Sequence, residues 1–95
     1  MRLLEIDNQE EMITILERAS YEVQCRRNII NFMINDGMNN TENFNKYWEE
    51  YICYTKAYDK LKHDFQVNYV IPNAGENFQG RWEVDFNTRE IKLYD

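Results

Sequence analysis

The chain has 95 residues, a formal net charge of −6 and a hydrophobic fraction of 43%. A chain this short forms one core more readily than two, so residues 1–95 are predicted to form a single domain. The excess of 17 acidic over 11 basic side chains argues against general nucleic-acid binding. No apolar run approaches the roughly 18 residues of a membrane span, and the N-terminus has no long apolar stretch typical of a secretory signal. We therefore expect a cytoplasmic protein without a membrane partner, and the Asn- and Ile-rich composition is typical of a bacterial or phage source.

The first predicted helix covers about residues 7–36. Asp7 and the acidic residues after it favour a helix start, and Gly37 supplies a left-handed stop. The apolar residues of this helix recur at intervals of four and three and share one stripe: Met12, Leu16, Ala19, Val23, Ile30 and Met33. Arg26 places a charge on the same stripe.

The second predicted helix covers about residues 42–67 and is capped by Thr41. Its apolar stripe is mostly aromatic and consists of Tyr47, Tyr51, Tyr54, Tyr58, Leu61 and Phe65, widened by Phe44, Trp48 and Ile52. The short connection predicts an antiparallel helical hairpin centred near residue 39, with Arg26 roughly opposite Tyr51.

Pro72, Gly75 and Gly80 predict a connecting loop over residues 68–80. Apolar and polar residues then alternate, which predicts a β-hairpin over residues 81–94 around an Asn87-Thr88 turn. Because Thr88 suits a tight turn poorly, a longer loop with a bulge is the alternative.

In the predicted register, Trp82 opposes Leu93 and Val84 opposes Ile91. A two-stranded ribbon is marginal in water, so it needs the helices, a third strand from residues 1–6, or a strand from a partner. The predicted fold class is α+β: a long antiparallel helical hairpin with a C-terminal two-stranded β-hairpin packed on its aromatic side.

The chain is poor in the side chains that carry catalysis. Ser20, His63 and the two cysteines, Cys25 and Cys53, are the whole nucleophile and base inventory, and helical rise places His63 far along the second helix from the cysteines. No metal-ligand spacing and no glycine-rich phosphate loop is present. We therefore predict a non-enzyme with no metal and no cofactor, in which both cysteines are free thiols.

The remaining candidates for a functional site are surfaces that could bind a partner or a ligand. The aromatic residues of the second helix are either core, covered by the first helix and the hairpin, or anchors of an interface. Arg26 either pairs with Glu22 or forms with Arg27 a cationic and aromatic pocket for a base, a phosphate or a carboxylate. The candidate binding residues are Arg26, Arg27, Tyr47, Trp48, Tyr51, Tyr54, Tyr58, Arg81 and Trp82.

The C-terminal third carries a family resemblance. It rests on residues 58–62 (Y-D-K-L-K), 69–72 (Y-V-I-P) and the tail 82–91, which reads W-x-x-D-F-x-x-x-E-I. These residues resemble the small clostridial accessory proteins encoded beside maturases of ribosomally made CXXX-repeat peptides. The resemblance implies a helper that binds a peptide or its modifying enzyme, and it carries over no site residues.

The leading hypothesis is a homo-oligomeric, non-catalytic interaction protein. It would dock a protein or peptide through the aromatic helical face, or by strand addition at the edge of the hairpin over 81–94. The alternative is a phage- or mobile-element-encoded sponge for a nucleotide signal, with Arg26, Arg27 and tyrosines binding a small anionic ligand at a subunit interface. A third hypothesis is an anti-defence inhibitor that mimics nucleic acid through its acidic surplus.

Overall fold

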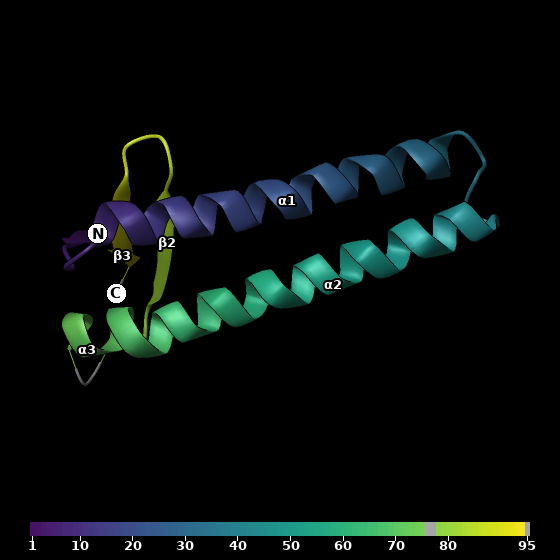
Figure 1. The fold of residues 1–95 in the computed structure, drawn as a ribbon. Helices are drawn as coiled ribbons and strands as arrows, with labels where there is room; N and C mark the ends of the chain where they lie inside the picture. Colours follow the sequence, from purple (N-terminus) through teal and green to yellow (C-terminus); the bar gives the residue numbers. More distant parts are fainter. Residues whose placement is uncertain (76–77, 95) are drawn as a thin grey trace. The chain divides into compact units, whose positions relative to one another are not determined.

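The computed structural model describes residues 1–75 and 78–94, and its elements follow the order β1, α1, α2, η1, α3, β2, β3 (Figure 1). The chain forms two compact units: unit 1 consists of Met1–Glu17 and Leu61–Asp95, and unit 2 consists of Arg18–Lys60. The long helices α1 and α2 each contribute to both units. Helices and an antiparallel sheet confirm the α+β class, and the single-domain interpretation stays a prediction.

Helix α1 runs over Gln9–Asn35 and helix α2 over Glu42–Phe65, close to the predicted limits. Gly37 ends α1 in the left-handed region at φ 73°, and the Met38 amide donates to the Met33 carbonyl oxygen at 2.8 Å. Thr41 caps α2, because its Oγ1 accepts a hydrogen bond from the Phe44 amide at 3.1 Å. Both helix ends are therefore set by the residues that the sequence indicated.

In unit 2 the two helices run antiparallel and form the predicted helical hairpin. Arg27 donates to the Tyr51 hydroxyl at 3.4 Å, which matches a hairpin centred near residue 39. The buried residues of this unit are Val23, Ile30 and Met33, all from α1. Within Glu42–Lys60, a segment the structure describes completely, no residue is buried. The helix pair therefore has a thin core.

The structure corrects the predicted loop over 68–80. Helix α2 continues into the π-helical turn η1 (Gln66–Val70) and then α3 (Ile71–Ala74), and only residues 75 and 78–80 are irregular. Residues 76–77 of the predicted loop lie outside the described residues. Pro72 stands in the first turn of α3, directly after the π-helical turn η1, and the helical path continues through it. Val70 is fully buried, which anchors the extra turns to the core of unit 1.

The sheet of unit 1 has three antiparallel strands in the order β1-β3-β2. Strands β2 (Arg81–Asp85) and β3 (Glu90–Tyr94) form the predicted hairpin, and the predicted pairs of Trp82 with Leu93 and Val84 with Ile91 are confirmed. Strand β1 (Arg2–Leu4) pairs with β3. The chain itself thus supplies the third strand.

One face of the sheet builds the core of unit 1. Ile91 and Leu93 of β3 are buried on this face, and Leu4 of β1 joins them. The start of α1 and the end of α2 complete the core with Ile13, Leu16 and Phe65. The Phe65 ring lies 5.2 Å from the Trp82 ring, and the Trp82 Nε1 donates to Gln66 Oε1 at 3.0 Å.

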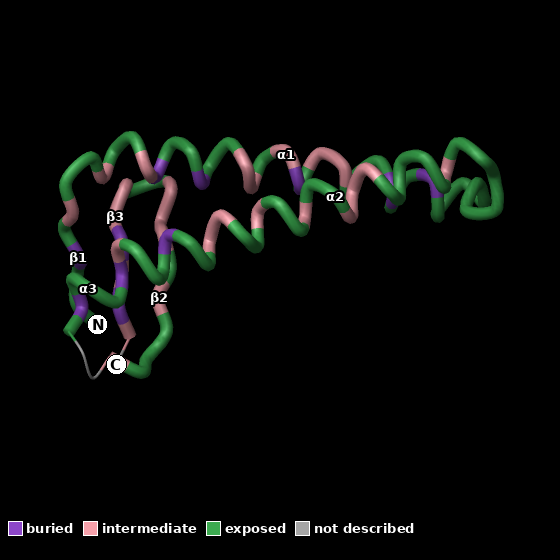
Figure 2. The backbone as a smooth tube through the Cα atoms, turned by 60° about the horizontal axis from the view of Figure 1, so that its bottom comes forward, coloured by how far each residue is buried: buried purple, intermediate pink, exposed green. Residues whose placement is uncertain are grey.

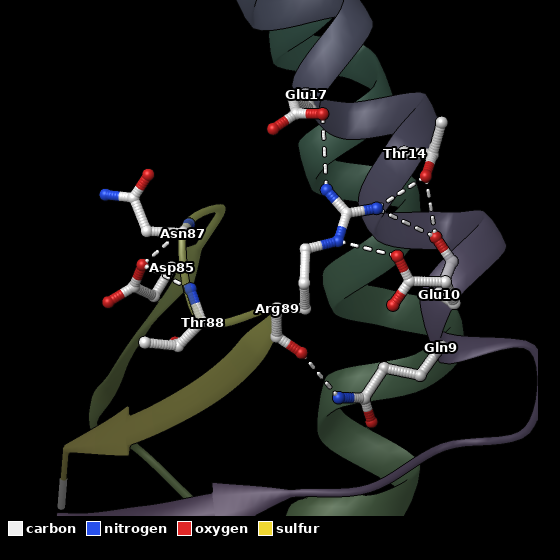
Figure 3. Close-up of polar contacts among 8 residues, drawn as sticks. All are labelled: Gln9, Glu10, Thr14, Glu17, Asp85, Asn87, Thr88 and Arg89. Carbon is white, nitrogen blue, oxygen red and sulfur yellow. Dashed lines mark hydrogen bonds and ion pairs between the residues drawn. The ribbon is translucent and has the colours of Figure 1, made fainter.

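The tip of the hairpin departs from the predicted two-residue turn, because residues 86–89 form a four-residue turn between the paired Asp85 and Glu90. The longer-loop alternative applies, with the same register. Arg89 occupies the left-handed region at φ 61°, and its amide donates to the Asp85 carbonyl at 2.8 Å. Its guanidinium hydrogen-bonds to Glu10, Thr14 and Glu17 of α1 (Figure 3). Arg89 therefore fastens the turn to the helix.

Asp85 organises the same turn. Its carboxylate accepts hydrogen bonds from the amides of Thr88 and Asn87 and from Lys92 Nζ, at 3.2, 2.9 and 3.1 Å. The bond from the Thr88 amide, followed by those from Lys92 and Asn87, holds the pKa of Asp85 below its ordinary value.

A pH dependence follows from Asp85. Since the unfolded chain protonates this carboxyl first, its stabilisation is complete above about pH 4 and is lost as the pH falls through the lower pKa of the folded state. Asp85→Asn retains an acceptor oxygen but does not titrate. Between about pH 5 and about pH 2.5 we expect a smaller loss of Tm in this variant than in the wild type, measured by circular dichroism. Equal losses of Tm in the two proteins would contradict the assignment of this pH dependence to Asp85.

Candidate docking surface

The aromatic residues of α2 in unit 2 are either half-buried or exposed. Tyr51 and Tyr58 are half-buried, whereas Tyr47, Trp48 and Tyr54 are exposed, Trp48 by 43%. Figure 2 shows that this part of α2 consists of exposed and intermediate positions. The core interpretation therefore applies only in part, and the interface interpretation stays a prediction for the exposed rings.

The exposed rings do not form one continuous face. Trp48 and Tyr54 are six residues apart, which puts them about 120° apart around the helix. Tyr47 and Tyr54 are seven residues apart and lie nearly in line. Because α1 contacts α2 between these directions at Tyr51, the rings lie on two flanks of the helix pair.

We call the first group the tryptophan flank: Arg27, Ile34, Phe44, Trp48 and Tyr51. The Trp48 ring stacks on Phe44 at 6.1 Å and meets the edge of Tyr51 at 5.8 Å. Arg27 bonds to the Tyr51 hydroxyl across the pair. The tryptophan flank is thus a row of mutually supported rings beside a cation.

Ile34 is a member of the tryptophan flank that the sequence interpretation missed. It follows Arg27 by seven residues, or two helical turns, so both lie on the same side of α1. Its side chain is exposed. The signal was present in the sequence as an apolar residue one position off the buried stripe, next to Met33.

We call the second group the tyrosine flank: Glu22, Arg26, Tyr47, Glu50 and Tyr54. Arg26 pairs with Glu22 one turn earlier on α1, as predicted, and also with Glu50 of α2 at 3.0 Å. Its guanidinium carbon lies 3.7 Å from the centroid of the Tyr54 ring, a cation–π contact. Arg26 thus joins the two helices.

The electrostatics of Arg26 are those of a satisfied ion pair. Desolvation lowers the pKa of Arg26, but the hydrogen bond to Glu22 and the negative charges of Glu22 and Glu50 outweigh it and raise the pKa overall. A phosphate or carboxylate ligand at this position would meet both of these carboxylates. The arrangement therefore favours a structural role for Arg26 over anion binding.

Arg81 and Trp82, the two remaining predicted site residues, belong to unit 1. Arg81 is exposed at the start of β2, with its guanidinium 5.1 Å from the Tyr94 ring, and Trp82 is half-buried against Phe65. The structure brings Arg26, Arg27 and the α2 rings together in unit 2 and places Arg81 and Trp82 in the other unit.

Cys25 and Cys53 are free thiols, and His63 is exposed. Over residues 1–75 and 78–94, no group of three or more His, Cys, Asp or Glu side chains is arranged to hold a metal ion. In the same residues no buried side-chain nitrogen or oxygen lacks a hydrogen-bond partner.

Comparisons with family models, curated proteins and solved structures find no match to this chain. The resemblance of the C-terminal third to clostridial accessory proteins therefore stays a prediction. Among the helices of the described residues, none has the length and apolarity needed to traverse a bilayer.

Proposed function

We propose that this protein is a non-enzymatic interaction protein that docks a protein or peptide partner on the tryptophan flank. The observation that supports this proposal is Trp48, which is 43% exposed while stacked on Phe44 and set against Tyr51. Trp, Tyr and Arg are the residues most enriched among the energetic anchors of interfaces, and the tryptophan flank presents all three.

The geometry lowers the entropic cost of binding. A free tryptophan side chain loses rotamer freedom when a partner covers it, but Trp48 is already restrained by two neighbouring rings. Ile34 adds apolar area and Arg27 adds a cation at the edge. These features suit a partner that lays apolar side chains on the rings and brings a carboxylate to Arg27.

Two other docking modes have weaker support. The tyrosine flank contains Arg26 already paired with Glu22 and Glu50, which does not favour a nucleotide ligand. Strand addition at β2 would use an edge whose outward side chains, Arg81 and Glu83, are exposed and charged. Charged side chains on an edge strand are typical of edges protected against pairing.

The proposal is tested with peptides selected on the protein itself. A display library of 12-residue peptides is panned on the immobilised chain, and recovered peptides are titrated by fluorescence anisotropy. We expect Trp48→Ala to weaken their binding by about tenfold or more, because it removes the central ring of the tryptophan flank.

The matched control is Tyr47→Ala, which removes an exposed ring from the tyrosine flank of the same helix and leaves the tryptophan flank intact. This variant is expected to bind the same peptides as the wild type does. Circular dichroism verifies that both variants remain helical. Failure to enrich any peptide, or peptides that bind Trp48→Ala and wild type equally, would count against docking on this surface.

A further inference from the structure

A second apolar stripe, which we call the outer stripe, runs along α1 in unit 2. Tyr21, Cys25, Ile29 and Phe32 are spaced by four, four and three residues, so they share one face of the helix. Tyr21 is 66% exposed and Phe32 is 63% exposed. The stripe lies on the side of α1 opposite to the buried Val23 and Ile30, and it shares no residue with the tryptophan flank.

The outer stripe is symmetric about residue 27. Tyr21 and Phe32 are nearly equidistant from this centre, as are Cys25 and Ile29. Suppose that two copies of α1 pair antiparallel through this stripe and cross at the level of residue 27. Tyr21 of each copy would then face Phe32 of the other. An arrangement in which residue i meets j and j meets i is what a two-fold interface requires.

Charged residues at the two ends of the stripe complement each other. Arg18 lies nine residues before residue 27 and Asp36 lies nine residues after it, on the same face of the chain. The antiparallel crossing therefore sets Arg18 of each copy against Asp36 of the other. A parallel crossing would instead oppose Arg18 to Arg18 and Asp36 to Asp36.

The negative charge of Asp36 is unfavourable at the end of α1, and this pairing would offset it. Asp36 directly follows the last residue of α1, where the helix dipole is negative, and the last turn of α1 contains no basic residue. An acidic residue is unfavourable there unless a cation comes close. Arg18 of a second copy would provide that cation at each end of the stripe.

The net charge of this segment also permits self-association. Residues 18–36 carry three basic side chains and two acidic ones, a balance of +1, whereas the whole chain carries −6. The neighbouring Gln24 and Asn28 are neutral and hydrogen-bond to each other at 3.0 Å. The small charge of this segment therefore keeps like-charge repulsion between two copies low along this face.

We propose that α1 is the interface of a two-fold homodimer, formed by antiparallel pairing of the outer stripe with end contacts between Arg18 and Asp36. This inference is independent of the proposed partner docking, since it uses a different face of α1. A pair of single helices over about 27 Å is smaller than a standard interface, so the dimer is expected to depend on concentration.

The test is sedimentation velocity of the full chain from about 5 to about 500 µM, a range that spans weak association. The wild type is expected to rise from the mass of one chain towards that of two. Arg18→Asp opposes two acidic side chains at each end and Asp36→Arg opposes two basic ones, so each variant is expected to stay monomeric. The double variant R18D/D36R recreates the attraction and is expected to dimerise again.

Glu49→Arg is the matched control, because it also exchanges an exposed acidic residue for arginine but lies on α2. It is expected to dimerise as the wild type does, and circular dichroism compares the helicity of all variants. A wild type that is monomeric throughout the range would overturn the proposal. So would a dimer that survives Asp36→Arg, or a double variant that does not regain association.

Discussion

Replacing Phe65 by alanine is expected to lower the free energy of unfolding of unit 1 by about 3–5 kcal/mol. Phe65 is 1% exposed and its ring stands 5.4 Å from Tyr69 and 5.2 Å from Trp82. The substitution removes the largest fully buried side chain and leaves a cavity between the end of α2 and the sheet. Because small domains are stable by only about 5–15 kcal/mol, this loss is expected to shift the denaturation midpoint strongly.

The positions of the two tryptophans allow the loss of stability to be assigned to unit 1. Trp82 contacts Phe65 in unit 1, and Trp48 lies in unit 2, so Trp48→Phe leaves a chain whose tryptophan fluorescence reports unit 1 alone. Phe65→Leu in this background retains most of the buried volume and is expected to cost less than the alanine variant. Equal midpoints for Phe65→Ala and its parent would show that Phe65 does not hold unit 1 together.

The sequence predicts the elements whose signals are local. The glycine stop at Gly37 and the Thr41 cap mark the helix ends through backbone conformation and side-chain hydrogen bonding, and both are confirmed. The register of the hairpin follows from alternation alone, so Trp82 and Leu93 pair as predicted. In such cases the structure of a segment is determined by residues that are close to it in the sequence.

Features that depend on distant residues are predicted less well. The helical turns over Gln66–Ala74 override the loop signal of Pro72 because Val70 and Ala74 are buried in the core of unit 1. The sequence offered residues 1–6 as one of several partners for the hairpin, and only the pairing of β1 with β3 selects among them.

The candidate surface also depends on residues that are distant in the sequence, so it is predicted only in part. Periodicity places the aromatic residues on one broad stripe of α2, but it does not specify where α1 crosses that stripe. The contacts of Arg26 and Arg27 reveal that α1 covers the middle, so Trp48 and Tyr54 emerge on separate flanks. The predicted pairing of Arg26 with Glu22 needed only one helical turn and is confirmed.

The second large effect is expected at Arg89, the residue that joins the hairpin turn to α1. Arg89 Nε donates to Glu10 at 2.7 Å and its Nη1 to Glu17 at 3.2 Å, while its carbonyl accepts a bond from Gln9 Nε2 at 3.1 Å (Figure 3). Arg89→Ala removes the guanidinium contacts and is expected to lower the free energy of unfolding by about 2 kcal/mol, a figure reduced for the exposure of both glutamates. Urea denaturation measures it.

A glycine at the same position separates the side chain from the backbone. At φ 61° an alanine retains the cost of the left-handed conformation, whereas glycine does not, so Arg89→Gly is expected to be more stable than Arg89→Ala by about 1 kcal/mol. Arg81→Ala is the matched control, since it truncates an exposed arginine of the same hairpin and is expected to change stability by no more than about 0.5 kcal/mol. If Arg81→Ala and Arg89→Ala cost the same, the bonds to Glu10, Thr14 and Glu17 do not fasten the turn, and the register of the hairpin is maintained by its strands alone.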